Sequence, residues 1–521
     1  MKINTKRTIY VGFAFFLILA FWQAYDSIIP LILTNKFGLP QFWSGVIMAL
    51  DNILALFLLP LFGTMSDKCK SKSGRRTPFI RVGTIVAVIL LMLLTVADLG
   101  QLKNIEKVST VDDPAALAVI YDSQANEQIV KPNKETATLV EEYFVLSDEI
   151  SREDFVEIKS IIADENGKNI TNPDYVNFVV PARQAYVWQI TAQNPQTLAL
   201  FVGVLFLLLI AMAIFRSPAV ALMPDVTEKP LRSKANAVIN LMGYTGGILV
   251  LVLGKIFATD APRNAMMSYM GYFGAVAALM VVALIVFLVK VKEPAWVKEV
   301  QETAEADSDD NAPAQPKRKL TKGEKVSLVL LLSSVVLWFF GYNAVSSKYS
   351  VYASNLLGKD FNVTLMIGTG AAIVSFVPVG ILSSQIGRKK AILIGVALLT
   401  AAFALAQFIT ASTPVVFMIA IFVLAGFAWA TINVNSFPMV VELCSDGDVG
   451  KYTGYYYTAS MAAQTLTPMV SGYLMDKMGM SILFPYAAIF VAGSFVTMLF
   501  VKHGDSKPES KKGLEALDVD D

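Results

Sequence analysis

The stretch GTMSDKCKSKSGRRTPF, residues 63–79, decides the fold because it sets a dense positive cluster between two uncharged apolar runs. Short loops rich in lysine and arginine mark the cytoplasmic side of a membrane protein. Gly63 and Gly74 permit tight turns within the stretch. Its basic residues are Lys68, Lys70, Lys72, Arg75 and Arg76. The stretch therefore predicts a cytoplasmic loop between two membrane-spanning helices.

The composition of the chain also indicates a membrane protein. Hydrophobic residues make up 55% of the 521 residues and charged residues 16%, whereas soluble proteins carry about 25% charged residues. A membrane-spanning helix needs about 20 apolar residues, and about twelve such runs occur. They lie near residues 8–34, 41–62, 79–98, 197–217, 235–257, 269–291, 326–347, 361–384, 390–410, 414–436, 452–474 and 482–502. The sequence predicts an all-α polytopic membrane protein with twelve transmembrane helices.

The distribution of charge predicts the orientation. The amino end, MKINTKR, carries positive charge before an apolar run that is too long, and too poor in a small-residue cleavage site, for a removable signal peptide. We expect this first helix to remain, with the amino end in the cytoplasm. The loop after the fourth helix then also faces the cytoplasm, and its basic residues agree: Arg216, Lys229, Arg232 and Lys234. The chain is expected to be a multi-pass protein of the plasma membrane with both termini cytoplasmic.

Two segments interrupt the helical pattern. The first is a linker, residues 292–325, which contains QETAEADSDDNAPAQPKRK, a composition typical of a flexible cytoplasmic tether. The second is an acidic insert, residues 99–196. The predicted segments are three helices in 1–98, the insert in 99–196, three helices in 197–291, the linker in 292–325, six helices in 326–502 and a cytoplasmic tail in 503–521.

The insert carries 16 acidic and 8 basic residues, and counting of membrane crossings places it outside the cell. The apolar periodicity of residues 138–146 and 154–162 suits helices, and residues 175–180, YVNFVV, suit a strand. We therefore expect a small folded extracytoplasmic domain rather than a disordered loop. Its partner is not assigned by the sequence.

Short matches between the two halves of the chain indicate an internal repeat. Matches before the insert are separated by 317 residues and the match after it by 217, a drop close to the length of the insert. The matching pairs are Tyr25 with Tyr342, Asp26 with Asn343, Gly63 with Gly380, and Asp225 with Glu442. The sequence predicts two six-helix pseudo-repeat bundles. Transporters built from such repeats bind substrate near the membrane midplane, between the halves.

Two loop motifs carry a family resemblance. Residues 63–79, echoed more weakly by GILSSQIGRKK at 380–390, resemble the loop signature of the major facilitator superfamily. Together with RSPAVALMPDVTEKPLRSKANAV at 216–238, they resemble the branch that holds the sucrose transporters and the glycoside-pentoside-hexuronide cation symporters. The resemblance implies a secondary active transporter of a sugar or glycoside that works by alternating access.

The same resemblance bears on the coupling ion. Melibiose-type members carry two acids before a Pro-x-x-Gly on the second helix, where they form a sodium site. This chain keeps Pro60 and Gly63, but Ala55 and Leu59 stand at the acidic positions. Because a hard cation needs several oxygen ligands, this departure implies protons rather than sodium.

Charged residues inside the apolar runs are candidates for coupling, since each costs roughly 2.5–3.5 kcal/mol to insert. With a rise of about 1.5 Å per residue, Asp26 and Asp51 fall in the outer half of the membrane. We predict that they carry the coupling proton. Lys348 lies at a comparable level on the repeat-related seventh helix. The alternatives are structural ion pairing for the two acids and extension of Lys348 into external water.

Polar and aromatic residues near these charges are candidate substrate ligands. Their flat apolar faces and hydrogen-bonding edges suit sugar rings and hydroxyl groups, although packing alone would also explain the aromatic ones. The predicted substrate-binding residues are Trp22, Gln23, Tyr25, Asn52, Tyr342, Asn343 and Lys348.

Charged residues at the cytoplasmic helix ends form a third predicted group. They could pair to hold the inner face closed and separate during alternating access, or the basic ones could only set topology. The predicted gate residues are Asp67, Arg75, Arg76, Asp225, Arg232, Arg388 and Glu442.

The chain lacks the residues that several other functions need. The single histidine, His503, excludes a histidine proton relay and a Ser-His-Asp triad, and no GxxxxGK[ST] phosphate loop is present. We therefore expect no enzyme activity, no cofactor, no metal site and no nucleic-acid partner; the expected partners are a sugar, protons and the lipid bilayer. The alternatives are a symporter of a non-sugar solute, such as an amphipathic lipid or a drug, and a non-transporting membrane receptor.

Overall fold

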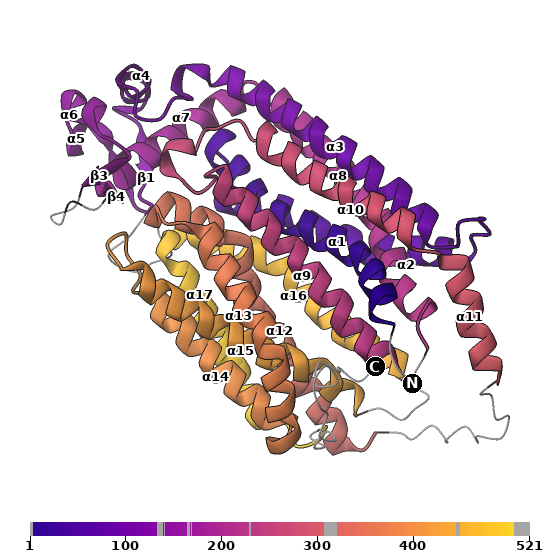
Figure 1. Ribbon diagram of the computed structural model, residues 1–521. Coiled ribbons are helices and arrows are strands. Elements are labelled where there is room, and N and C mark those ends of the chain that lie inside the picture. The colour runs from indigo at the N-terminus through magenta and orange to yellow at the C-terminus, as the bar shows by residue number, and fades with distance from the viewer. Residues whose placement is uncertain are drawn as a thin grey trace.

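The computed structural model describes residues 4–132, 139, 141–163, 167, 169–228, 231–306, 320–443 and 449–504. Within them the chain forms a bundle of long helices with a small domain, the cap, on one end (Figure 1). We call this end of the bundle the cap end. The opposite end, which carries the basic loop 68–76, is called the loop end. The chain is an all-α polytopic membrane protein, as the sequence predicts.

Long apolar runs with few internal charges form these helices because a backbone in lipid must satisfy its hydrogen bonds within the segment. The first half comprises α1 (Thr5–Leu31), continued by the π-helical turn η1 (Ile32–Lys36), α2 (Gln41–Asp67), α3 (Thr77–Asn104), α8 (Gln196–Asp225), α9 (Arg232–Ile256) and α10 (Met270–Lys290). The second half comprises α12 (Lys322–Val351), continued by η6 (Tyr352–Leu357), α13 (Phe361–Ile386), α14 (Arg388–Ala406), α15 (Val415–Val441), α16 (Val449–Met478) and α17 (Leu483–Leu499).

Ten helices of the described residues are long and apolar enough to cross a membrane. Of the remaining two, α13 has a shorter apolar section, Phe361–Phe376, and α16 is richer in polar residues. Because α16 packs against α2 and α12, part of its surface faces protein. The count of twelve membrane-spanning helices stays a prediction.

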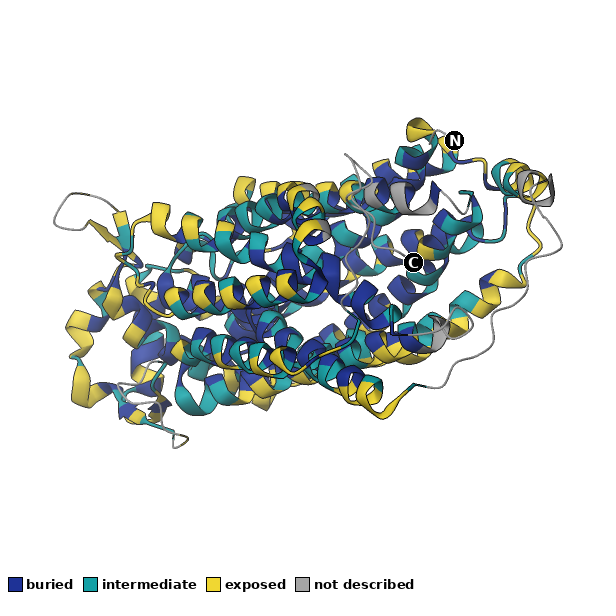
Figure 2. Ribbon diagram, turned by 90° about the horizontal axis from the view of Figure 1, so that it is seen from below, coloured by how far each residue is buried: buried dark blue, intermediate teal, exposed yellow. Residues whose placement is uncertain are grey.

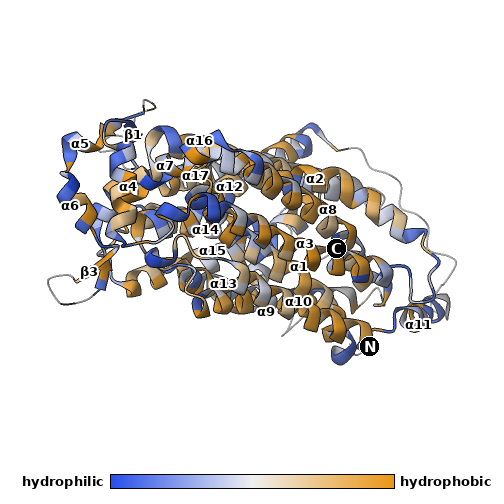
Figure 3. Ribbon diagram, turned by 90° about the horizontal axis from the view of Figure 1, so that it is seen from above, coloured by the Kyte–Doolittle hydropathy of each residue, from blue (hydrophilic) through white to orange (hydrophobic). Residues whose placement is uncertain are grey.

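The helix contacts repeat between the halves. In the first half α1 packs on α9 and α10, and α8 on α2 and α3; in the second, α12 packs on α16 and α17, and α15 on α13 and α14. Contacts between the halves are α2 with α16, α9 with α13, and α1 with α12. This pairing is what the two predicted pseudo-repeats require. The bundle buries apolar residues within it and exposes them around its surface (Figures 2 and 3).

The cap has its own hydrophobic core, which includes Leu117, Phe144 and Phe155. Its elements are η2 (Glu106–Val108), α4 (Pro114–Gln124), β1 (Gln128–Val130), β2 (Tyr143–Val145), α5 (Leu146–Glu149), α6 (Arg152–Glu157), β3 (Ile161–Ala163), β4 (Asn169–Thr171), η3 (Tyr175–Val179) and α7 (Val180–Gln193). Antiparallel pairs form between β1 and β2 and between β3 and β4. Figure 3 shows that hydrophilic residues are more frequent in the cap than along the helices of the bundle.

The local predictions for the insert are wrong in part. Residues 143–145 of the segment 138–146 form a strand, β2, instead of a helix. Residues 154–157 of the segment 154–162 are helical, within α6, but residues 161 and 162 belong to β3. The YVNFVV segment is helical, because Tyr175, Val176 and Val179 are buried as the segment runs directly into α7. Tertiary packing overrides the β propensity of valine and tyrosine here.

The cap contacts both halves. It continues covalently from α3 into α8, and its described residues also interact with the second half. Lys477 pairs with Glu141 at 2.8 Å, the Met480 N–H donates to the Pro132 carbonyl at 2.9 Å, and the Thr171 hydroxyl donates to the Gly358 carbonyl at 3.1 Å.

The predicted flexible linker contains a helix, α11 (Glu293–Ala306), at its start. Glu293 is buried and accepts hydrogen bonds from the backbone N–H groups of Arg75, Arg76 and Thr77, each at 2.8 Å. It thereby caps α3, whose own N-cap residue supplies no side-chain acceptor. This contact holds the start of the linker against the basic loop. Residues 307–319 of the linker lie outside the described part of the chain.

Candidate substrate and coupling site

Three charged side chains from three helices of the first half interact with one another. Asp26 of α1, Asp51 of α2 and Arg216 of α8 are each partly buried, and their charges act on one another. Asn52 donates to the Asp51 carboxylate at 2.7 Å. Two carboxylates and one guanidinium leave one negative charge uncompensated, so binding of a single proton would make the cluster neutral.

Arg216 corrects a prediction. The sequence predicted a cytoplasmic loop at this position, but α8 continues to Asp225 and carries Arg216 within the helix. Its guanidinium carbon lies 5.4 Å from the centroid of the Trp22 ring, in cation-π geometry. Pro218 and Pro224 lie inside the helix, although proline disfavours a helix interior. The sequence signal that the helix continues is the run of mostly apolar residues between Arg216 and Asp225.

Aromatic residues from both halves lie beside this charged cluster. Tyr342 of α12 stacks on Trp429 of α15 with ring centroids 3.5 Å apart and planes 6° apart. The charge of Asp26 acts on Tyr342 across the boundary between the halves. Tyr244 of α9 contacts Phe376 of α13, with ring centroids 6.0 Å apart, also across this boundary. Nothing in the sequence had distinguished Trp429 or Tyr244 from other aromatics in membrane helices.

Two predicted ligands present hydrogen-bonding groups without a partner among the described residues. These groups are the indole Nε1 of Trp22 and the amide Nδ2 of Asn343. Buried polar groups are costly to leave unpaired. Both atoms are buried in this conformation, so a bound molecule reaches them only when the site opens, whereas part of the Trp22 ring is already exposed.

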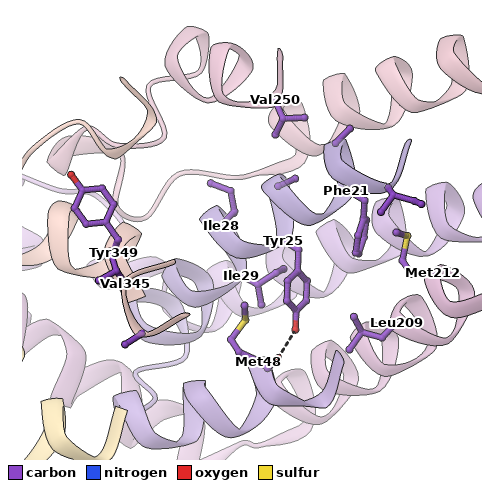
Figure 4. Packing of buried hydrophobic residues seen from close by; sticks show 14 of the residues in the cluster. Phe21, Tyr25, Ile28, Ile29, Met48, Leu209, Met212, Val250, Val345 and Tyr349 are labelled. Atoms are coloured by element: carbon purple, nitrogen blue, oxygen red, sulfur yellow. Dashed lines mark hydrogen bonds between the residues drawn. The ribbon is translucent and has the colours of Figure 1, made fainter. Parts of the chain in front are cut away.

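Two other predicted ligands serve the packing of the first half instead. Tyr25 is buried, its hydroxyl points toward the Met48 carbonyl at 3.5 Å (Figure 4), and its ring meets Trp22 edge-on with centroids 5.3 Å apart. It therefore supports the Trp22 ring without offering a face of its own. Gln23 donates to Ser27 at 3.0 Å and lies against Gly247 of α9. The rotation of α1 about its own axis decides which way both side chains point. A helix that is apolar on every side carries no periodic signal in the sequence for this rotation.

Lys348 is fully buried, so the alternative that it extends into external water is wrong. Its Nζ donates to the carbonyl oxygen of Gln41 at 2.7 Å, across the boundary between α12 and α2. Asp476 of α16 accepts from the backbone N–H groups of Gln41 and Phe42, each at 2.7 Å. Lys348 therefore belongs to a contact that closes the cap end, rather than to the substrate cluster.

Other polar contacts between the halves lie at the same end. Asn355 of η6 donates to Asn35 of η1 at 2.6 Å, and Asn362 of α13 donates to Thr259 at 3.0 Å. Lys255 of α9 pairs with Asp360. Together with the contacts of Lys348 and Asp476, they join the halves at the cap end.

The predicted gate residues pair within each half. In the first half, Asp225 binds Arg75 at 2.6 Å and Arg76 at 2.8 Å, and Arg76 binds Asp67 at 2.5 Å. In the second half, Arg388 binds Glu442 at 2.7 Å, which joins α14 to α15 as the first network joins α3 to α8. These pairs follow the repeat. The side chain of the predicted gate residue Arg232 lies outside the described part of the structure.

Comparison with known proteins identifies the family. The family model described as Major Facilitator Superfamily matches residues 185–385 and 366–518, and one described as MFS/sugar transport protein matches residues 10–102. The chain is 41% identical over 67 residues to the sucrose transport protein SUC4 of Arabidopsis thaliana, covering 13% of each chain. It is 41% identical over 66 residues to the proton-associated sugar transporter A of Homo sapiens, covering 12% of this chain and 9% of the relative. The aligned segment thus spans only a small part of the length of these curated relatives.

Solved structures share the fold over nearly the whole chain. The inward-open xylose transporter XylE of E. coli aligns with a TM-score of 0.56, 14% identity and 99% coverage of both chains. A peptide transporter, POT, aligns with a TM-score of 0.57, 10% identity, and 95% and 93% coverage. The nucleoside transporter NupG aligns with a TM-score of 0.52, 12% identity, and 95% and 100% coverage. Because these proteins are named for different solutes, the shared fold does not select a substrate.

Proposed function

Since the chain belongs to the major facilitator superfamily, we propose that it is a secondary active transporter that moves a sugar or glycoside together with protons. The observation that carries the proposal is the cluster of Asp26, Asp51 and Arg216 beside aromatic residues of both halves. The matches to sugar-transport relatives over short segments support the substrate class. Membership of this family means that the chain is a multi-pass membrane protein of a transporter family rather than of an enzyme family.

The proposed coupling rests on charge balance. When both acids are ionised, the cluster carries one excess negative charge, and a net charge in a region of low dielectric is unfavourable. A proton on Asp51 or Asp26 removes this charge and lets the halves rearrange around a neutral site. Arg216 keeps the remaining carboxylate compensated throughout.

The proposed substrate contacts are stacking and hydrogen bonding. Trp22 and the stacked Tyr342 and Trp429 offer flat surfaces for the apolar face of a sugar ring. The indole of Trp22 and the amide of Asn343 offer donors for its hydroxyl groups. The same flat surfaces also suit an amphipathic solute, which is the second candidate.

We further propose that the loop end faces the cytoplasm of a plasma-membrane protein, so that the conformation described, joined at the cap end, is inward-facing. The basic loop at 68–76 supports this orientation. The cap, residues 99–196, is then extracytoplasmic. The residues of the loop-end ion pairs, which pair within each half in this conformation, are candidates to pair across the halves when the inner gate closes. A cysteine placed at Ser123 should react with an impermeant reagent from outside only.

Uptake of labelled sugars into vesicles that contain the purified protein tests the function. The wild type should accumulate sugar when the outside is acidic and should be indifferent to sodium. Asp51→Asn and Asp26→Asn should reduce accumulation while partly sparing counterflow exchange, and Arg216→Gln should impair both. Asp122→Asn, an exposed acid of the cap, is the matched control. Normal accumulation in both Asp variants would contradict the coupling site, and saturable stimulation by sodium would contradict proton coupling.

The same vesicles separate the alternatives. A transporter of a non-sugar solute would move that solute in response to the pH gradient without competition from any sugar. A non-transporting receptor would move no solute under any gradient, even though ligand binding would raise its thermal stability.

A further inference from the structure

A small cavity lies at the cap end where the cap, the first half and the second half meet. Its wall includes Tyr175 and Arg183 of the cap, Asn35 of η1 and Asn355 of η6. The loop before α10 adds apolar atoms, including those of Met266. The cavity is separate from the Asp26, Asp51 and Arg216 cluster, and the proposed transport function makes no use of it.

Arg183 is the unusual member of this wall. It is only 4% exposed, and its Nη1 donates to the Tyr175 hydroxyl oxygen at 3.0 Å. Its Nε and Nη2 have no hydrogen-bond partner within the described part of the chain. A guanidinium is always protonated, and burying a charge without compensation is costly. The described residues of the cavity wall include no acid that would balance it.

The surrounding groups present further donors. Because the Tyr175 oxygen accepts from Arg183, its own O–H is free to donate. Asn35 uses its side-chain oxygen to accept from Asn355 at 2.6 Å, which leaves the N–H groups of Asn35 available. The Asp260 carboxylate is directed elsewhere, since it accepts from Asn362 at 3.2 Å and lies 3.8 Å from Lys255. A buried cation with neighbouring donors is a site for an anion.

The size of the cavity restricts the anion. Its volume is about 20 Å³, close to what a single water-sized sphere occupies. A sugar or a sulfate exceeds this space, whereas a monatomic ion does not. We propose that Arg183, Tyr175 and Asn35 bind a halide ion, with chloride as the probe.

The position of the site gives the ion a conformational effect. Arg183 belongs to the cap, Asn35 to the first half, and Asn355, which holds Asn35, to the second half. Opening of the cap end would separate Asn35 from Asn355 and dismantle the site. An ion that binds only the closed arrangement shifts the population toward it, and closure in turn raises the affinity for the ion. Chloride therefore stabilises the conformation that is closed at the cap end.

Thermal unfolding of the full-length protein in detergent tests the site without reliance on transport. Chloride is exchanged for gluconate at constant sodium and ionic strength. The wild type should show a saturable rise in unfolding temperature with chloride, reproduced by bromide and not by sulfate. Arg183→Gln should abolish the rise, and Tyr175→Phe should weaken the apparent affinity for chloride several-fold. Arg152→Gln removes an exposed arginine of the cap and should respond as the wild type does.

Two results would overturn the proposal: an equal chloride response in Arg183→Gln and the wild type, or a wild-type response that does not saturate. If Arg183→Gln does not fold, anomalous scattering from bromide in crystals of the wild type decides the matter. A bromide peak beside Arg183 supports the site, whereas water in that position contradicts it. Spin labels across the cap end should report a larger closed population in chloride than in gluconate, and an unchanged distribution would contradict the conformational effect.

Discussion

Asp476 of α16 caps the amino end of α2 from the opposite half of the molecule. Its two carboxylate oxygens accept from the N–H groups of Gln41 and Phe42 at 2.7 Å each. The residue at the N-cap position of α2 is Pro40, which has no side-chain acceptor. The first turn of one half thus depends on the other half for its hydrogen bonds.

Removal of this cap should favour opening of the cap end. Loss of an N-cap side chain costs about 0.5–2 kcal/mol, so Asp476→Ala should shift the population roughly 2- to 30-fold toward the open state. Distances between spin labels on the two halves at the cap end measure the shift. Ser151→Ala, which removes the cap of α6 within the insert, is the control and should change nothing. Equal distance distributions in Asp476→Ala and the wild type would show that water replaces the cap at no cost.

Close approach of α2 and α16 requires two glycines, one from each half. A Cβ at Gly45 would overlap the carbonyl of Pro468, and a Cβ at Gly472 would overlap that of Gln41. Because backbone atoms cannot move aside as a side-chain end can, Gly45→Ala should force the helices apart at the cap end. Gly370→Ala in α13, where a Cβ meets nothing within 4 Å, is the matched control. The same labelled positions report the result, and an unaltered distance in Gly45→Ala would contradict the packing.

A buried ion pair stabilises the cap end of the first half. Lys36 Nζ lies 2.6 Å from Asp98 Oδ1, both side chains are inaccessible, and the ammonium lies 4.5 Å from the centroid of the Tyr269 ring. Breaking a buried pair by removing one partner costs about 3–5 kcal/mol, because the other charge is left uncompensated. Lys36→Met should therefore lower stability strongly, and Lys36→Met with Asp98→Leu should recover part of the loss. Denaturant unfolding of the single and double variants measures this, and strictly additive losses would show that the charges do not interact.

The carboxyl of Asp260, in the loop after α9, predicts a pH dependence of stability. Burial, and then the negative charge of Asp360, raise the pKa of Asp260 above its ordinary value of about 3.8. Because this folded-state pKa exceeds the unfolded one, the ionised carboxylate opposes folding at neutral pH. The penalty declines as pH falls below the folded pKa and vanishes below the unfolded pKa. Asp260→Asn should thus unfold at a higher temperature than the wild type at pH 7, with the difference shrinking toward pH 4. A constant difference across this range would exclude ionisation of the Asp260 carboxyl as its cause.

Single residues illustrate how far sequence reasoning reached into the site. Asp26 and Asp51 could be singled out, because ionised groups inside apolar runs are rare and costly. The sequence does not place Arg216 in the site, because it predicts a loop there, whereas α8 continues past it to Asp225. Tyr25 was assigned to the site although it is buried in the core, since residues next to each other on a helix point in different directions.

The sequence alone determined the membrane class, the family resemblance and the repeat, because these depend on local properties: the length of apolar runs, the side on which basic residues gather and short motifs at fixed spacing. The tertiary structure decided which polar and charged groups meet. Helix rotation and the approach of the two halves set these pairings. They bring Asp476 to Gln41, Lys36 to Asp98, and Arg183 and Asn35 to one cavity. Helices that are apolar on every side carry no periodic signal for that rotation, so only packing specifies it.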